Sequence, residues 1–151
     1  MTESHPLSDH LGFVLRRAQL SVFQDFQQAV DGLDLTPAAY SVLVILGRHP
    51  GMRQNKLTDL LAIKPANCVT LINGLEKRGL VVREKVKVSG RAVALSLTAN
   101  GLVVMADADA RVEAHLGRMR ERLGDEDAAR LLALLHKLVA SGGEVLADSE
   151  L

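Results

Sequence analysis

Apolar residues recur every three or four positions through the first part of the chain, from Leu7 to Leu33. This spacing predicts an amphipathic helix of about 24 residues, ~36 Å long. Phe13, Leu20 and Phe23 lie off the main stripe, so the helix would carry a second apolar face. Because a domain of this size cannot cover both faces of so long a helix, we expect a second subunit to cover one of them.

A second helix is predicted between a clear start signal and a clear stop signal. Thr36 is a suitable N-cap, and Pro37 fits the first helical position, where no backbone N–H is needed. The apolar pattern continues to about Arg48, and Pro50-Gly51 then ends the helix.

Two further helices follow, separated by a turn at Ile63-Lys64. The first is predicted over residues 54–62. The second begins at Pro65 and reaches Arg78, and Gly79 then serves as its C-terminal cap. The first helix is expected to turn three leucines inward: Leu57, Leu60 and Leu61.

The hydrophobic period changes from 3.6 to 2 over residues 81–88 and 91–97, which predicts two strands. Ser89-Gly90 between them is suited to a hairpin turn. The second strand places three apolar residues on one face: Val93, Leu95 and Leu97.

Two C-terminal helices complete a fold that is mainly α with a small β-hairpin. Thr98 is expected to cap a helix over residues 99–123, which ends at Gly124. Acidic residues 125–127 suit the first turn of the last helix. The last helix carries an apolar stripe formed by Ala128, Leu131, Leu132, Leu135, Leu138 and Val139.

The composition narrows the class of protein. With 48% hydrophobic and 24% charged residues, the chain is neither disordered nor membrane-spanning, and no apolar run approaches the ~20 residues that a bilayer requires. Residues 1–6 are polar and lack an apolar core, so a signal peptide is not expected there. The single cysteine, Cys68, suits a reducing compartment, so a cytoplasmic location is expected.

The formal net charge is zero, but the charges are unevenly distributed. Residues 48–91 contain ten basic and three acidic side chains, a net charge of +7, and the rest of the chain carries −7. Such an asymmetry indicates a polyanionic partner for the middle segment.

The order of elements in the basic segment is helix, turn, helix and hairpin. In helix-turn-helix proteins, the second helix enters the major groove of DNA, and a following hairpin would lie along the backbone as a wing. Arg83, Lys85 and Lys87 lie two residues apart and would share one face of a strand, with Arg91 just after the turn. These side chains are candidates to neutralise phosphates.

Several motifs in this region resemble the MarR family of transcriptional regulators. Leu35-Thr36-Pro37 resembles the start of the family's second helix, and residues 54–63 resemble its SQxxLAxxLxI helix-turn. Residues 75–81 read LEKRGLV, and residues 97–101 fit the LTxxG pattern after the wing. Their order and spacing carry the resemblance over residues 35–101.

The resemblance implies a winged helix-turn-helix domain over residues 35–100, between dimerisation helices at residues 1–34 and 101–151. It further implies a homodimeric repressor of double-stranded DNA that a small ligand releases. A two-fold dimer should recognise a pseudo-palindromic operator with half-sites about 34–36 Å apart. No cofactor or metal is implied.

Residues 65–78 then become the recognition helix, with Cys68, Leu71, Ile72 and Leu75 turned inward. Asn67 and Asn73 could pair with adenine, and Val69 or Thr70 could contact thymine methyl groups. Arg53 and Gln54, at a helix N-terminus, suit phosphate contacts. The predicted DNA-binding residues are Arg53, Gln54, Lys64, Ala66, Asn67, Val69, Thr70, Asn73, Lys77, Arg83, Lys85, Lys87 and Arg91.

The chain departs from the family pattern at the wing. The family has a DxRR-like element there, and this sequence keeps only Arg91 of it, without the acidic partner. The recognition helix has Thr70 and Gly74 where the family often has basic residues. We therefore expect specificity to depend on a few polar contacts and on groove shape, with the wing supplying charge.

The family's effectors are often phenolic or aromatic acids bound between the dimerisation helices and the winged domain. Arg17 could pair with a ligand carboxylate as a planar bidentate donor. The predicted ligand-binding residues are His10, Phe13, Val14, Arg17, Tyr40 and Val44.

Other classes of function receive less support from the sequence. The histidines are scattered without metal-ligand spacing, and no Gly-rich phosphate loop or nucleophile motif suggests an enzyme. A winged-helix module that binds proteins instead of DNA remains an alternative, but it would not need the +7 segment. Cys68 occupies an inward position, which argues against a role as a redox sensor.

Overall fold

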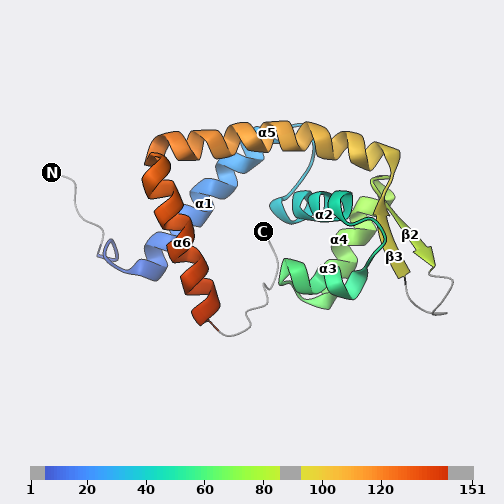
Figure 1. The fold of residues 1–151 in the computed structure, drawn as a ribbon, viewed down its shortest axis with the longest axis horizontal. Helices are drawn as coiled ribbons and strands as arrows, with labels where there is room; N and C mark the ends of the chain where they lie inside the picture. Colours follow the sequence, from blue (N-terminus) through green and yellow to red (C-terminus); the bar gives the residue numbers. More distant parts are fainter. Residues whose placement is uncertain (1–5, 86–92, 143–151) are drawn as a thin grey trace.

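The computed structural model describes residues 6–85 and 93–142 of the chain. In chain order its elements are α1 (Leu11–Ala29), α2 (Pro37–Arg48), β1 (Met52–Arg53), α3 (Gln54–Leu61), α4 (Pro65–Lys77), β2 (Val81–Lys85), β3 (Val93–Leu97), α5 (Ala99–Leu123) and α6 (Asp125–Ser141). Helices α2, α3 and α4 gather with the sheet at one end of the molecule, α5 runs along one side, and α1 and α6 extend at the other end (Figure 1).

The predicted starts of α2 and α5 and the predicted break between α5 and α6 depend on local capping and are confirmed. The Thr36 hydroxyl accepts a hydrogen bond from the Ala39 amide at 3.1 Å, and Pro37 follows in the first turn of α2. The Thr98 hydroxyl accepts from the Gly101 amide at 2.9 Å at the start of α5. Gly124, with φ +81°, separates α5 from α6.

The first helix is shorter than predicted. α1 has 19 residues, since Leu7–His10 form a turn in which the His10 amide bonds the Leu7 carbonyl at 3.0 Å. At its other end, Gly32 (φ +81°) and Asp34 (φ +50°) take left-handed conformations that no α-helix contains. The apolar spacing continues through both segments and therefore did not reveal these ends.

The sheet has three strands in the order β1-β3-β2, of which the sequence predicted two. Met52 pairs with Leu95 and Arg53 with Ala94, so β1 adds a short antiparallel edge to β3. The Gly51 amide extends this pairing by bonding the Leu95 carbonyl at 2.9 Å. A strand of two residues has no periodicity by which a sequence pattern could identify it.

The core lies where α2, α3, α4 and β3 meet. Its fully buried side chains include Leu43, Leu46, Leu57, Ile72 and Leu95. The predicted inward position of Leu60 is wrong: its side chain is 56% exposed, because α3 turns Leu57 and Thr58 toward the core instead.

The apolar faces at the other end of the molecule are largely uncovered. No residue of α6 is buried, and Val139 on its stripe is 76% exposed. On α1 only Phe26 is buried, while Leu11 at its start is 71% exposed. Among the described residues, no helix is both long enough and apolar enough to cross a membrane.

Candidate nucleic-acid interface

The turn between α3 and α4 fixes the angle at which α4 leaves the core. Ala62 ends α3 in a left-handed conformation with φ 51°, and the next side chain, Ile63, is 7% exposed. Pro65 then opens α4 at a position where its missing N–H costs no hydrogen bond. The result is the predicted helix-turn-helix.

One face of α4 packs into the core and the opposite face is open to solvent. Cys68, Ile72 and Leu75 are buried, as the sequence predicted, and Leu71 is half-buried. Four of the predicted DNA-binding residues follow one exposed stripe along the helix: Ala66, Thr70, Asn73 and Lys77. Lys64 and Val69 are also exposed, and Asn67 is half-buried at the edge of this face.

The wing is tied to α4 by an ion pair that the sequence did not suggest. Arg83 on β2 donates from Nη1 to Oε2 of Glu76 on α4. The register places Arg83 opposite Leu95 and Lys85 opposite Val93, so both cations lie on one face of the hairpin, as expected from their spacing. Lys87 and Arg91 lie outside the described residues.

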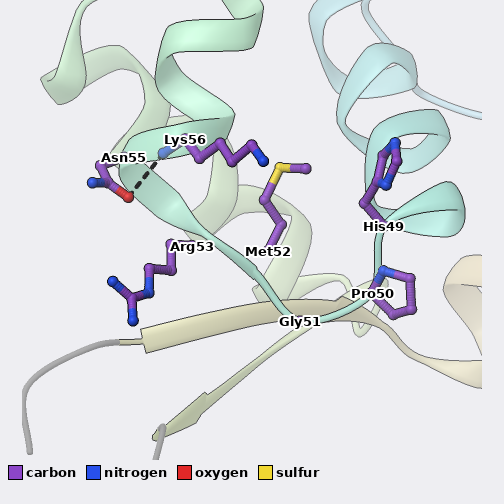
Figure 2. A pocket seen from close by; sticks show the side chains of 7 residues that line it. All are labelled: His49, Pro50, Gly51, Met52, Arg53, Asn55 and Lys56. Carbon is purple, nitrogen blue, oxygen red and sulfur yellow. Dashed lines mark hydrogen bonds between the residues drawn. The ribbon is translucent and has the colours of Figure 1, made fainter. Parts of the chain in front are cut away.

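A basic concavity lies where α2, β1 and α3 meet (Figure 2). Arg53 is the N-cap residue of α3, and the side chain of Asn55 accepts a hydrogen bond from the Lys56 amide at 2.9 Å. No acidic residue lines the concavity, and the positive end of the α3 dipole adds to its attraction for anions. Its lining residues are His49, Pro50, Gly51, Met52, Arg53, Asn55 and Lys56.

Of the seven residues that line this concavity, only Arg53 belonged to the predicted site, and the six that were absent include three with polar or basic side chains: His49, Asn55 and Lys56. Lys56 was identified only as part of the basic segment, because nothing local to it indicates its orientation. The arrangement depends on β1, which joins the end of α2 to the start of α3.

A second groove connects the concavity to the recognition helix. It lies between α3 and α4 and is lined by Gln54, Asn55, Thr58, Asp59, Pro65 and Val69. Asn55 lines both hollows, so they adjoin. The structure thereby brings Gln54 and Val69, predicted from separate motifs, to one surface.

The predicted ligand-binding residues fall into two separate groups within one chain. His10 precedes α1, and Phe13, Val14 and Arg17 lie in its first two turns, which stand away from α2 in Figure 1. Tyr40 and Val44 are half-buried on α2. A single copy of the chain does not bring the two groups together.

Tyr40 is held in place by α1 and α5. Its hydroxyl donates to Oδ1 of Asp109 at 2.7 Å, and its ring lies 5.8 Å from that of Phe26. Burial and the adjacent Asp109 carboxylate raise the pKa of the Tyr40 phenol. Tyr40 is therefore neutral at physiological pH.

A polar cluster that the sequence did not reveal joins α1 to α5. His115 is 2% exposed, and its Nδ1 lies 2.8 Å from Oδ2 of Asp25. Arg118 donates to the other oxygen of the same carboxylate at 3.3 Å. The hydrogen bond from His115 and the charge of Arg118 hold the pKa of Asp25 below its usual value.

The chain forms a winged helix-turn-helix protein: α3 and α4 make the helix-turn-helix, the paired strands β2 and β3 follow it, and the basic concavity adjoins it. Comparison with known proteins specifies the family. The MarR family profile matches residues 33–92. The transcriptional repressor CouR, solved bound to a 23-mer DNA duplex, is 39% identical, with a TM-score of 0.85 over 88% of this chain and 94% of that one. The chain belongs to the MarR family of transcriptional regulators.

Two further comparisons agree with this assignment. CouR solved with p-coumaroyl-CoA is 36% identical over 94% of this chain and 100% of that one, again with a TM-score of 0.85. A transcriptional regulatory protein proposed for the hcr operon of Thauera aromatica is 28% identical over 94% of this chain and 86% of its own length. All of these relatives are named as regulators of transcription.

Proposed function

We propose that the chain is a homodimeric repressor that binds a pseudo-palindromic DNA operator and is released by a small ligand. The main support is the continuous surface formed by the basic concavity, the groove between α3 and α4, and the open face of α4. CouR, of the same fold, has been solved on a DNA duplex.

On this surface the helix face reads bases and its surroundings bind phosphates. Asn67 and Asn73 present amides suited to adenine, and Val69 and Thr70 present methyl groups suited to thymine. Thr70 donates its hydroxyl to the Ala66 carbonyl at 3.1 Å, which leaves its methyl group for such a contact.

The phosphate contacts are assigned to the basic and polar side chains around this helix face. Lys56 and His49 join the set because they line the concavity. The remaining members are Arg53, Gln54, Lys64, Lys77, Lys85, Lys87 and Arg91, with Arg83 contributing if its pair with Glu76 opens on binding.

The dimer forms through the segments outside the winged domain, residues 1–34 and 101–151. The uncovered apolar faces of α1 and α6 support this arrangement, since a single copy leaves both in water. A second copy would also bring its own α1 toward this chain, which is the means by which the two groups of ligand-binding residues could form one pocket.

The effector is assigned to the aromatic acids and their thioesters. CouR has been solved with p-coumaroyl-CoA, so an aromatic acyl-CoA is the first compound class to test. Such a ligand acts by binding more tightly to a dimer whose recognition helices are misplaced for the operator.

Selection of bound fragments from genomic DNA by the purified protein tests the proposal. Enrichment of an inverted repeat with half-sites one helical turn apart is expected. Recovery of no inverted repeat would overturn it in favour of a protein-binding winged helix. Adding p-coumaroyl-CoA to the bound complex then tests the effector class, because release of the DNA is expected. A cytoplasmic location is also proposed, because a regulator of transcription acts where the DNA is.

A further inference from the structure

The loop between α1 and α2 (residues 30–36, which we call the connector) is held by an arginine from the end of the recognition helix. Arg78 directly follows α4 and is its C-cap residue. Its Nη1 donates to the carbonyl oxygen of Asp34 at 2.6 Å, and its Nη2 donates to that of Leu33 at 2.7 Å. One guanidinium therefore binds two successive peptide groups of the connector.

A second arginine holds the same connector from α5. Arg111 donates from Nη1 to the carbonyl oxygen of Asp31 at 2.8 Å. Its Nε and Nη2 donate to the carboxylate of Asp107, one turn earlier on α5, at 2.9 and 3.1 Å. The Asp107 carboxylate thus orients the guanidinium toward the connector.

The connector is itself a fixed joint and not a loose linker. Val30 and Leu35 near its two ends are each 2% exposed, buried in the core. Between them, Gly32 and Asp34 take left-handed conformations that set the path of the chain. Arg78 therefore connects the end of α4 to the segment that directly follows α1 in the chain.

We infer that Arg78 is a positioning residue that sets the angle between the recognition helix and the dimerisation helices. This inference rests on the proposed function. In a dimer, the separation of the two recognition helices depends on how each is joined to the helices at the interface, and that separation must match the spacing of the half-sites. Release of the connector would leave DNA binding possible but make it tolerant of other spacings.

The test compares two DNA duplexes: the inverted repeat that the protein selects from a random pool, and the same repeat with one base pair inserted at its centre. Arg78→Lys keeps the positive charge but cannot donate to two carbonyls through one planar fork. We expect it to reduce the preference for the native spacing by about tenfold, the scale of losing one or two charge-assisted hydrogen bonds. Arg53→Gln is the control, which should weaken binding to both duplexes equally.

The outcomes distinguish failure of this inference from failure of the proposed function on which it rests. Retention of the full spacing preference by Arg78→Lys, with an even loss on both duplexes in Arg78→Gln, would identify Arg78 as a phosphate contact and overturn the inference alone. Failure of the wild-type protein to select any inverted repeat would overturn the proposed function together with it. Should Arg78→Lys not fold by circular dichroism, Arg111→Lys weakens the hold on the same connector from α5 instead and carries the same expectation.

Discussion

At Gly101 the first turn of α5 lies against the backbone of the residue that precedes β2. A Cβ at this position would meet the carbonyl oxygen of Leu80 at 2.1 Å, far inside contact distance. Thr98 strengthens the junction, because its hydroxyl donates to the Gly79 carbonyl at 2.5 Å. The Gly of the LTxxG motif is thus required by the close approach of two backbones.

Gly101→Ala is therefore expected to lower the free energy of unfolding by about 1–3 kcal/mol, because the helix must shift away from Leu80. Urea unfolding followed by circular dichroism measures this change. Gly74→Ala on α4 is the control: no atom lies within 4 Å of its added methyl group, so it should stabilise the chain by about 0.5–1 kcal/mol. Equal effects of the two substitutions would contradict the steric explanation.

Cys68 is the residue at which oxidative regulation can be tested. Its side chain is fully buried among the core residues of α4, where peroxide has no access to the sulfur. DNA binding by the wild-type protein should therefore be unchanged after treatment with hydrogen peroxide, as measured by gel shift. A loss of binding that Cys68→Ser abolishes would show that Cys68 is a sensor after all.

Between elements, the ion pair of Arg83 and Glu76 determines how much charge the wing offers to DNA. Glu76→Gln would release Arg83, so tighter binding and a salt dependence steeper by up to about one phosphate contact are expected. Lys85→Gln should make the slope of log K against log salt shallower by about 0.9. Titrations at several salt concentrations measure both slopes, and a shallower slope in Glu76→Gln would mean that the pair itself orients the wing for binding.

The cluster of Asp25, His115 and Arg118 predicts how the contact between α1 and α5 responds to acid. The pKa of Asp25 is held below its ordinary value of 3.8, so its charged form stabilises the fold above that pH, and this stabilisation is lost as the pH falls through the lower folded value. Wild-type stability should therefore decline below about pH 4.

Asp25→Asn should be less stable than the wild type at pH 7 and should lose less stability between pH 5 and pH 2. Urea unfolding at a series of pH values provides the measurement. Arg118→Gln removes one partner of the carboxylate and should change the profile in the same direction. An unchanged profile in Asp25→Asn would assign the acid sensitivity to other carboxyl groups.

The elements differ in how far the sequence could predict them, for physical reasons. Caps such as Thr36 and Thr98 bond within their own first turn, so their residue type and position suffice. β1 exists only through the pairing of Met52 with Leu95, far along the chain. α3 spans about two turns, too short for the spacing of its leucines to distinguish the inward position of Leu57 from the outward one of Leu60.

In the candidate site, too, the features that depend on local sequence could be predicted, and those that depend on contacts between distant segments could not. The exposed stripe of α4 followed from helical periodicity alone, since one face had to be buried. The basic concavity and the pair of Arg83 with Glu76 required the relative placement of separate elements, which no local pattern contains. The ligand-binding residues stay a prediction, because the first two turns of α1 do not approach Tyr40 and Val44 on α2 within one chain.

For the whole molecule, the uncovered apolar faces predict that assembly depends on α1 and α6. Leu132 on α6 is 58% exposed in a single chain, and a glutamate there would be buried without a partner in the dimer. Leu132→Glu should therefore yield monomers in sedimentation equilibrium and lose operator binding.

Leu60→Glu is a matched control for this prediction. Leu60 is 56% exposed but lies on α3, in the winged domain. It should leave the dimer intact. Dissociation of both variants would point to a general loss of folding, and dissociation of neither would exclude α6 from the interface.

The absence of any buried residue on α6 also bears on the life of the protein in the cell. A newly made copy displays the apolar face of α6 until it meets another copy, and such surfaces are what chaperones and proteases bind. Its lifetime should then increase with its own concentration, since pairing withdraws the helix from degradation. Quality control would thus remove unpaired copies, and the repressor could accumulate only above the concentration at which its subunits pair.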